Sequence, residues 1–102
     1  MSREKTQRKV ALQGFTRNEN VLKQMLDDPD VPKDIVAPQY LKVQACWTKL
    51  EDAHDGYLNS IEGDIEDEDL NKLNEPGVRY SSVVKRYIEF VKGANATELV
   101  GA

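Results

Sequence analysis

Apolar side chains recur every three or four residues along most of the chain, which is the spacing of one face of an α-helix. In the first such segment, residues 2–27, they are Leu12, Phe15, Leu22 and Leu26. Glu19 takes the remaining position of this heptad pattern. The pattern predicts one helix over residues 2–27. A break at Gly14 stays open, because glycine costs about 1 kcal/mol relative to alanine inside a helix.

The second predicted helix spans residues 38–61 and has the most regular pattern. Its apolar and aromatic positions are Tyr40, Val43, Trp47, Leu50, Tyr57 and Ile61, and His54 fills the gap between them. Pro29 and Pro32 mark the turn that precedes it. Pro38 suits the first turn of a helix, where its missing N–H has no partner in any case, so we expect the helix to begin there.

An acidic connector follows over residues 62–74. Its density of carboxylates prevents it from packing as a core helix, so we expect it to be exposed to solvent. Leu70 and Leu73 allow one short amphipathic turn within it. Asp64, Glu66, Glu68 and Glu75 superficially match ligand positions of a calcium loop, but Asp69 stands where that loop needs glycine. No metal site is expected.

The third predicted helix spans residues 75–92, with Pro76 in its first turn. Its apolar positions are Tyr80, Val84, Tyr87 and Val91, and Val83, Ile88 and Phe90 widen the stripe. Gly93 is a natural C-terminal stop, which leaves residues 94–102 as a flexible tail.

Three amphipathic helices joined by polar turns predict an all-α fold. The architecture is an antiparallel three-helix bundle or an extended helical hairpin with coiled-coil-like packing. The length of 102 residues fits a single domain. The same three-four rhythm fits packing within one chain and packing between chains, so the pattern does not choose between them.

Composition narrows the class of protein. A net charge of −4 argues against a chain that coats nucleic acid over its whole surface. The single cysteine, Cys46, excludes an internal disulfide and a multi-cysteine metal site, and it indicates an intracellular, cytoplasmic setting. No apolar run reaches the length of a membrane span, and no signal peptide is evident, so no membrane contact is expected.

Few residues offer catalytic chemistry. His54 lies on the second helical stripe, and its neighbours Asp52 and Asp55 face other directions, so a partly buried or seam histidine is the favoured interpretation. Cys46 is interpreted as a small packed or half-exposed thiol. Because no acid, base and nucleophile converge, the chain is expected to be no enzyme, with no cofactor and no small-molecule substrate.

The basic residues near the N-terminus are candidates for weak contact with RNA. They are Arg3, Lys5, Arg8, Lys9 and Arg17. Such a cluster binds phosphates by releasing counterions. No aromatic side chains alternate with it to stack on bases, and a solvated first helical turn explains it equally well.

The large side chains on the stripes are candidates for a protein interface. They are Phe15, Leu22, Trp47, Leu50, Tyr57, Tyr80, Val84 and Tyr87. Tyrosine and tryptophan are frequent both in cores and at protein interfaces, so the pattern leaves their roles divided between the two. The expected partner is a second copy of the chain or another helical protein.

Three groups of residues together carry a family resemblance. They are Gly14, Phe15, Thr16, Arg17, Val21 and Leu22; Trp47, Leu50, His54, Tyr57 and Leu58; and Tyr80, Ser81, Ser82, Val83 and Val84. With the acidic connector, they resemble the helical domain near the N-terminus of Gag polyproteins from BEL/Pao-type LTR retrotransposons. The resemblance covers residues 8–91. Pro76 and Gly77 depart from the continuous helix that the family would have there.

The resemblance implies a structural role without catalysis, in which chains associate into a Gag-like capsid assembly. A retrotransposon domain taken over by a host gene would look the same. The alternative is a monomeric helical adaptor or an RNA-contacting module that uses the basic N-terminal arm.

Overall fold

The first helix is continuous through Gly14. The computed structural model describes residues 3–101, and side chains for residues 3–93. Within it, α1 spans Arg3–Asp27 without a break. Arg8 before the glycine and Phe15 after it are both buried. Packing on both sides of Gly14 therefore supports one helix across the weak position.

The second helix begins earlier than the sequence predicts. Helix α2 spans Lys33–Ser60, so the expected start at Pro38 is wrong and this proline lies inside the helix. Val36 is fully buried in the core, and its burial favours a helical turn ahead of the proline. The cost is the backbone hydrogen bond that Pro38 cannot donate. Tertiary packing here outweighs the local preference.

The acidic connector is exposed and contains one short helix. Residues 62–68 are all exposed, and α3 spans Asp67–Leu70. Gly63 has a φ of 91°, a left-handed conformation that residues with a Cβ adopt only at a cost. Leu73 packs against the core and its carbonyl accepts a hydrogen bond from the Gly77 amide. The connector thus leads directly into the next helix.

The last helix continues past its predicted end. Helix α4 spans Asn74–Gly101, so it does not stop at Gly93. A glycine ends a helix by adopting a positive φ, and Gly93 does not adopt one. Alanine and glutamate in the sequence that follows favour helix and offset the cost of the glycine. The side chains of residues 94–101 and the whole of residue 102 lie outside the described part, and the predicted flexibility of this tail stays a prediction.

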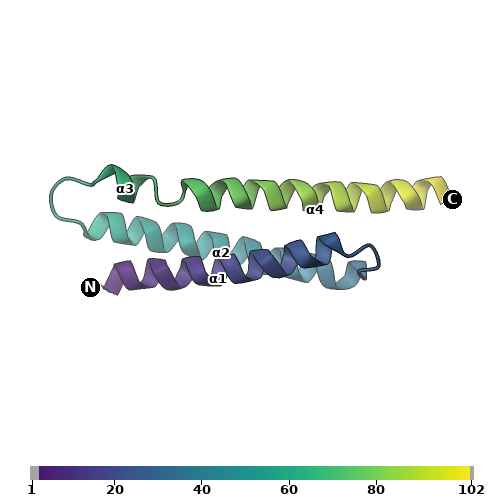
Figure 1. Ribbon diagram of the computed structural model, residues 1–102, viewed down its shortest axis with the longest axis horizontal. Coiled ribbons are helices and arrows are strands. Elements are labelled where there is room, and N and C mark those ends of the chain that lie inside the picture. The colour runs from purple at the N-terminus through teal and green to yellow at the C-terminus, as the bar shows by residue number, and fades with distance from the viewer. Residues whose placement is uncertain (1–2, 102) are drawn as a thin grey trace.

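The long helices run side by side as a rod of 62 × 19 × 16 Å. Figure 1 shows α1 and α2 as an antiparallel hairpin, with α4 alongside and antiparallel to α2. The far end of α4 projects beyond the turn that joins α1 to α2 (Figure 1). The described elements are all helical, which confirms the predicted all-α fold of packed helices.

The core is a single narrow stripe, as expected for helices that share one seam. Its fully buried apolar side chains are Phe15, Leu22, Val36, Val43, Leu50 and Val83. On α4 the buried position is Val83, whereas the sequence placed Val84 at the centre of the stripe. The stripe of α4 therefore passes through Tyr80, Val83 and Tyr87, and Val84 lies at its edge.

The glycines provide a test of this fold. Gly14 lies in a helix with no atom within 4 Å of an added Cβ, so Gly14→Ala should raise the free energy of unfolding by about 0.5–1 kcal/mol. Gly63→Ala should lower it by about 1–2 kcal/mol, because of the left-handed φ. Thermal unfolding followed by circular dichroism measures both changes. Destabilisation by Gly14→Ala would contradict a continuous α1.

Candidate interaction surface

Three of the predicted interface residues belong to the core. Phe15, Leu22 and Leu50 are fully buried, so a partner cannot contact these side chains in this fold. The prediction is corrected for them, because α1 and α2 bury each other's central positions. The remaining candidates are half-buried: Trp47, Tyr57, Tyr80, Val84 and Tyr87. Their exposed edges are available to a partner.

Aromatic rings join α4 to the hairpin. The Trp47 and Tyr80 rings stack with centroids 5.0 Å apart, and the Tyr40 and Tyr87 rings stack at 3.9 Å. Phe15 of α1 contacts both Trp47, at 5.3 Å, and Tyr80, at 6.0 Å. One ring from each long helix thus meets at a single aromatic cluster. Because these rings are large and stack between α2 and α4, they keep the backbones of the two helices apart.

A groove of about 550 Å³ lies between α2 and α4. It is lined by Tyr40, Gln44, Tyr80, Ser81, Val84, Lys85, Ile88, Glu89 and Lys92. Burial raises the pKa of the Tyr80 phenol above its ordinary value of 10.0, and the Tyr40 hydroxyl accepts a hydrogen bond from the Gln44 side chain. The floor is therefore uncharged at neutral pH. We call it the α2–α4 groove.

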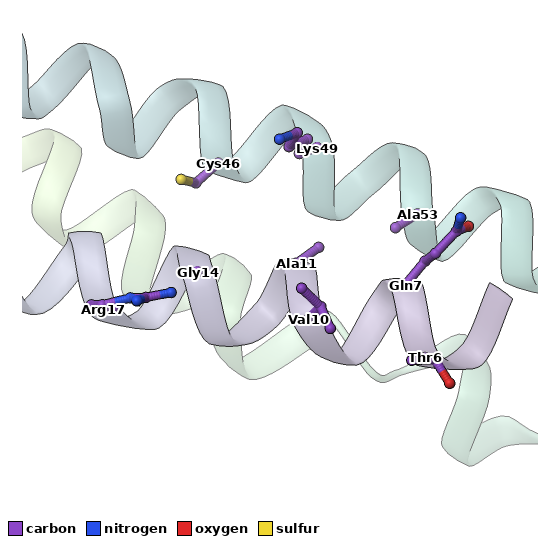
Figure 2. Close-up of a pocket in the computed structure, with 9 residues that line it drawn as sticks. All are labelled: Thr6, Gln7, Val10, Ala11, Gly14, Arg17, Cys46, Lys49 and Ala53. Atoms are coloured by element: carbon purple, nitrogen blue, oxygen red, sulfur yellow. The ribbon is translucent and has the colours of Figure 1, made fainter. Parts of the chain in front are cut away.

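A second groove, of about 530 Å³, lies between α1 and α2. Figure 2 shows the nine lining residues: Thr6, Gln7, Val10, Ala11, Gly14, Arg17, Cys46, Lys49 and Ala53. In this view α4 lies behind the two front helices, so the groove opens on a face that α4 does not cover (Figure 2). We call it the α1–α2 groove. The sequence analysis did not identify it, because most of its lining residues are too small to mark a site.

Cys46 lies at this groove as a half-buried thiol. Its sulfur accepts a hydrogen bond of 3.4 Å from the Asn18 side-chain amide. Buried Gln39 in turn donates to the Asn18 carbonyl and side-chain oxygens, at 3.0 and 3.2 Å. Cys46 therefore belongs to a polar link between α1 and α2. Among the described residues, no three histidine, cysteine, aspartate or glutamate side chains are arranged to hold a metal ion.

Arg8 is not part of a solvated basic arm. Its side chain is 5% exposed, its guanidinium lies 4.1 Å from the centroid of the Tyr57 ring, and it is 3.4 Å from His54 Nδ1. It also pairs with Asp69 Oδ1 of α3 at 3.5 Å. The prediction that Arg8 contacts nucleic acid is therefore corrected. Its place seven residues before Phe15, which is itself seven before Leu22, is the signal that could have placed it in the seam.

The other basic candidates do not form one surface. Arg3, Lys5, Lys9 and Arg17 are exposed on α1. Arg3 and Lys5 differ by about 200° around the helix axis at 3.6 residues per turn, so they face opposite sides. Lys5 and Lys9 share one face, at a spacing of four, and Arg17 lies on the side of Arg3 but about 21 Å further along the helix at about 1.5 Å per residue. The continuous helix therefore disperses the charge that is clustered in the sequence.

A buried carboxylate of α1 pairs with a partly exposed arginine of α4. Glu19 has 0% exposure, and its carboxylate lies 3.5 Å from Arg79 Nε and 3.6 Å from Lys23 Nζ. Neither carboxylate oxygen has a hydrogen bond of good geometry, although Arg79 also donates to Thr16 Oγ1 at 3.2 Å. The pair therefore fixes how α4 lies on α1 while adding little net stability.

No helix in the described part of the chain is both long and apolar enough to cross a membrane.

His54 gives a pH test of the Arg8 cluster. Burial lowers the pKa of His54 below 6.5, and the nearby Arg8 lowers it further, against smaller opposing effects of Asp55 and Asp69. As the pH falls through 6.5, His54 becomes protonated in the unfolded chain before it does in the folded chain. The free energy of unfolding therefore decreases as the pH falls through 6.5. We expect the urea midpoint to drop between pH 7 and 5.5. His54→Gln should remove this dependence, and an unchanged slope in that variant would contradict the assignment.

Arg79 and Glu19 give a test by double substitution. Arg79→Ala should lower the free energy of unfolding by about 2 kcal/mol, because it leaves the buried Glu19 carboxylate without its partner on α4. Glu19→Leu with Arg79→Leu should restore stability to the wild-type value or above, since apolar packing replaces both charges. Urea denaturation measures each variant. A double variant as unstable as Arg79→Ala would show that the pair itself contributes the stability.

Comparison with known proteins identifies no relative of this chain. The resemblance to a Gag helical domain therefore stays a prediction from the residues quoted for it. No protein-family model, curated protein or solved structure matches the chain.

Proposed function

We propose that this chain is a non-catalytic interaction domain that associates with further copies of itself, as in a retrotransposon Gag-like capsid assembly. The observation that carries the proposal is the α2–α4 groove. It combines an uncharged aromatic and aliphatic floor with charged residues at its edges, which is the usual composition of a protein interface. Ile88 in this groove is 44% exposed.

The charges at this groove suit a second copy of the same helix. Lys85 and Glu89 both line the groove and are four residues apart, so they lie on one face of α4. When two copies of α4 pack antiparallel through the face of Lys85 and Glu89, with the two-fold axis midway between these residues, each Lys85 lies opposite the partner copy's Glu89. A two-fold contact places the same surface on both chains, and this pair makes the surface complementary to itself. The contact is therefore expected to produce a dimer.

The shape of the rod supports the same proposal. The far end of α4 extends past the α1–α2 turn (Figure 1). An antiparallel second copy of α4 would run alongside the helix in this direction. The Gag-like resemblance implies association between chains and agrees with this arrangement. In that case the dimer contact would be one of the contacts of a capsid-like assembly.

The rival function, an RNA-contacting monomer, has less support from the geometry. Arg8 is buried and the remaining basic candidates are spread around α1. No described aromatic side chain lies between them as a platform for bases.

Charge reversal tests the two-fold contact. Lys85→Glu alone, or Glu89→Lys alone, places like charges opposite each other and should raise the dimer dissociation constant on the order of tenfold. The double variant Lys85→Glu with Glu89→Lys exchanges the charges and should return the constant to the wild-type value. Analytical ultracentrifugation over a dilution series at low salt measures all four proteins.

Val78→Lys is the matched control, because Val78 is exposed on α4 and does not line the groove. It should leave the dissociation constant unchanged. A wild-type chain that sediments as a monomer at every concentration would overturn self-association. Tight binding of single-stranded RNA by that monomer would then favour the rival function.

A further inference from the structure

The α1–α2 groove is a second surface without a partner in the described chain. We infer that it binds the acidic segment, residues 62–70, of another copy of this chain; the inference rests on the proposed self-association. The proposed contact joins an apolar groove with a basic edge to an exposed acidic segment that carries apolar side chains. The argument depends on the lining of the groove, its charge and the chemistry of the segment.

The floor of the groove accepts apolar side chains. Ala11, Gly14 and Ala53 contribute small or absent side chains, and Val10 at the edge is 61% exposed. Gly14 has open space around it, with no heavy atom within 4 Å of a built Cβ. A chain segment could therefore approach the helix backbone closely at this point. Exposed apolar surface in a concave site is a usual mark of a binding site.

The groove has a positive edge. Arg17 and Lys49 line it from α1 and α2, and none of its nine lining residues is acidic. Figure 2 shows these two side chains on different helices, Arg17 on α1 and Lys49 on α2. A second copy of the same groove would bring like charges together. The charge therefore favours an acidic partner surface over a groove-to-groove contact.

The acidic segment supplies the matching chemistry. Residues 62–70 contain no basic residue and carry these carboxylates: Glu62, Asp64, Glu66, Asp67, Glu68 and Asp69. Two apolar side chains stand among them, Ile65 at 38% and Leu70 at 50% exposure. Neither belongs to the core of its own chain. The segment can thus place apolar side chains in the groove while its carboxylates meet Arg17 and Lys49.

The contact is directional, from the groove of one chain to the acidic segment of another. The groove and the acidic segment are different surfaces of one chain, so each chain can bind one neighbour through its groove and another through its segment. Combined with the two-fold contact at the α2–α4 groove, it would join dimers into larger assemblies. Nucleic acid is the less suitable occupant of the groove, because no aromatic residue lines it for base stacking.

The experiment compares the mass of full-length variants by sedimentation at low salt. Wild type should grow beyond the dimer as its concentration rises. Arg17→Glu with Lys49→Glu should stop at about twice the chain mass of 11.6 kDa. Asp64→Lys with Glu66→Lys should stop there also. Mixing these two double variants should restore growth, because the unchanged groove of the second variant then meets the unchanged acidic segment of the first.

The control is Lys42→Glu with Lys72→Glu. It changes the net charge by the same amount as Arg17→Glu with Lys49→Glu, at exposed positions outside both grooves. It should assemble like wild type, and circular dichroism confirms that every variant is folded.

Growth of the Arg17 and Lys49 variant beyond the dimer, equal to wild type, would overturn this inference and leave the proposed self-association intact. A monomeric wild type would overturn both. If the variant with Arg17→Glu and Lys49→Glu assembles like wild type but no longer binds a single-stranded RNA oligonucleotide, the groove is assigned to nucleic acid instead.

Discussion

The structure depends on one aromatic cluster that contacts all three long helices. Phe15 of α1, Trp47 of α2 and Tyr80 of α4 meet there, and no other group of rings joins three helices in the described part of the chain. Aromatic side chains bury much apolar area with few rotatable bonds, so a few of them can dock a helix. Their size also keeps α2 and α4 apart, and a groove remains between these helices. The same interaction therefore holds α4 in place and creates the surface proposed for dimerisation.

Polar side chains occupy several positions of the core stripe. Arg8, Glu19, Gln39 and His54 are all buried, each with a partner on another helix. Among the side chains that the structure describes, six apolar ones are fully buried, and so narrow a stripe offers many ways for helices to slide past each other. Charged and hydrogen-bonded partners penalise the wrong registers, because each shift would leave a buried polar group unpaired. We infer that these residues select one arrangement at some cost in stability.

The two grooves differ in chemistry in a way that suits two different contacts. The α2–α4 groove carries both signs of charge on one helix face, which favours a copy of itself. The α1–α2 groove carries only positive charge and favours an acidic surface. A chain with one self-complementary and one directional contact can build an extended assembly from a single type of subunit. This is the physical requirement of the Gag-like role proposed for the chain.

Local pattern in the sequence determined the helices, because each follows from side chains three or four residues apart. The heptad positions of Phe15, Leu22, Val43 and Leu50 were sufficient to place the α1–α2 core. The start of α2 and the end of α4 could not be found this way, since the burial of Val36 and the absence of a positive φ at Gly93 depend on the folded chain.

The surfaces were decided by the tertiary structure alone. Arg8 was expected in a basic arm and is buried beside His54. Its heptad position places it on the inward face of α1, but only the packed helices show the partners that allow a guanidinium to be buried there. The α1–α2 groove arises from small residues of two consecutive helices, and the residues from α1 lie far in sequence from those of α2. Local periodicity therefore determines which segments are helical, whereas only the contact between segments decides which of their side chains a partner can reach.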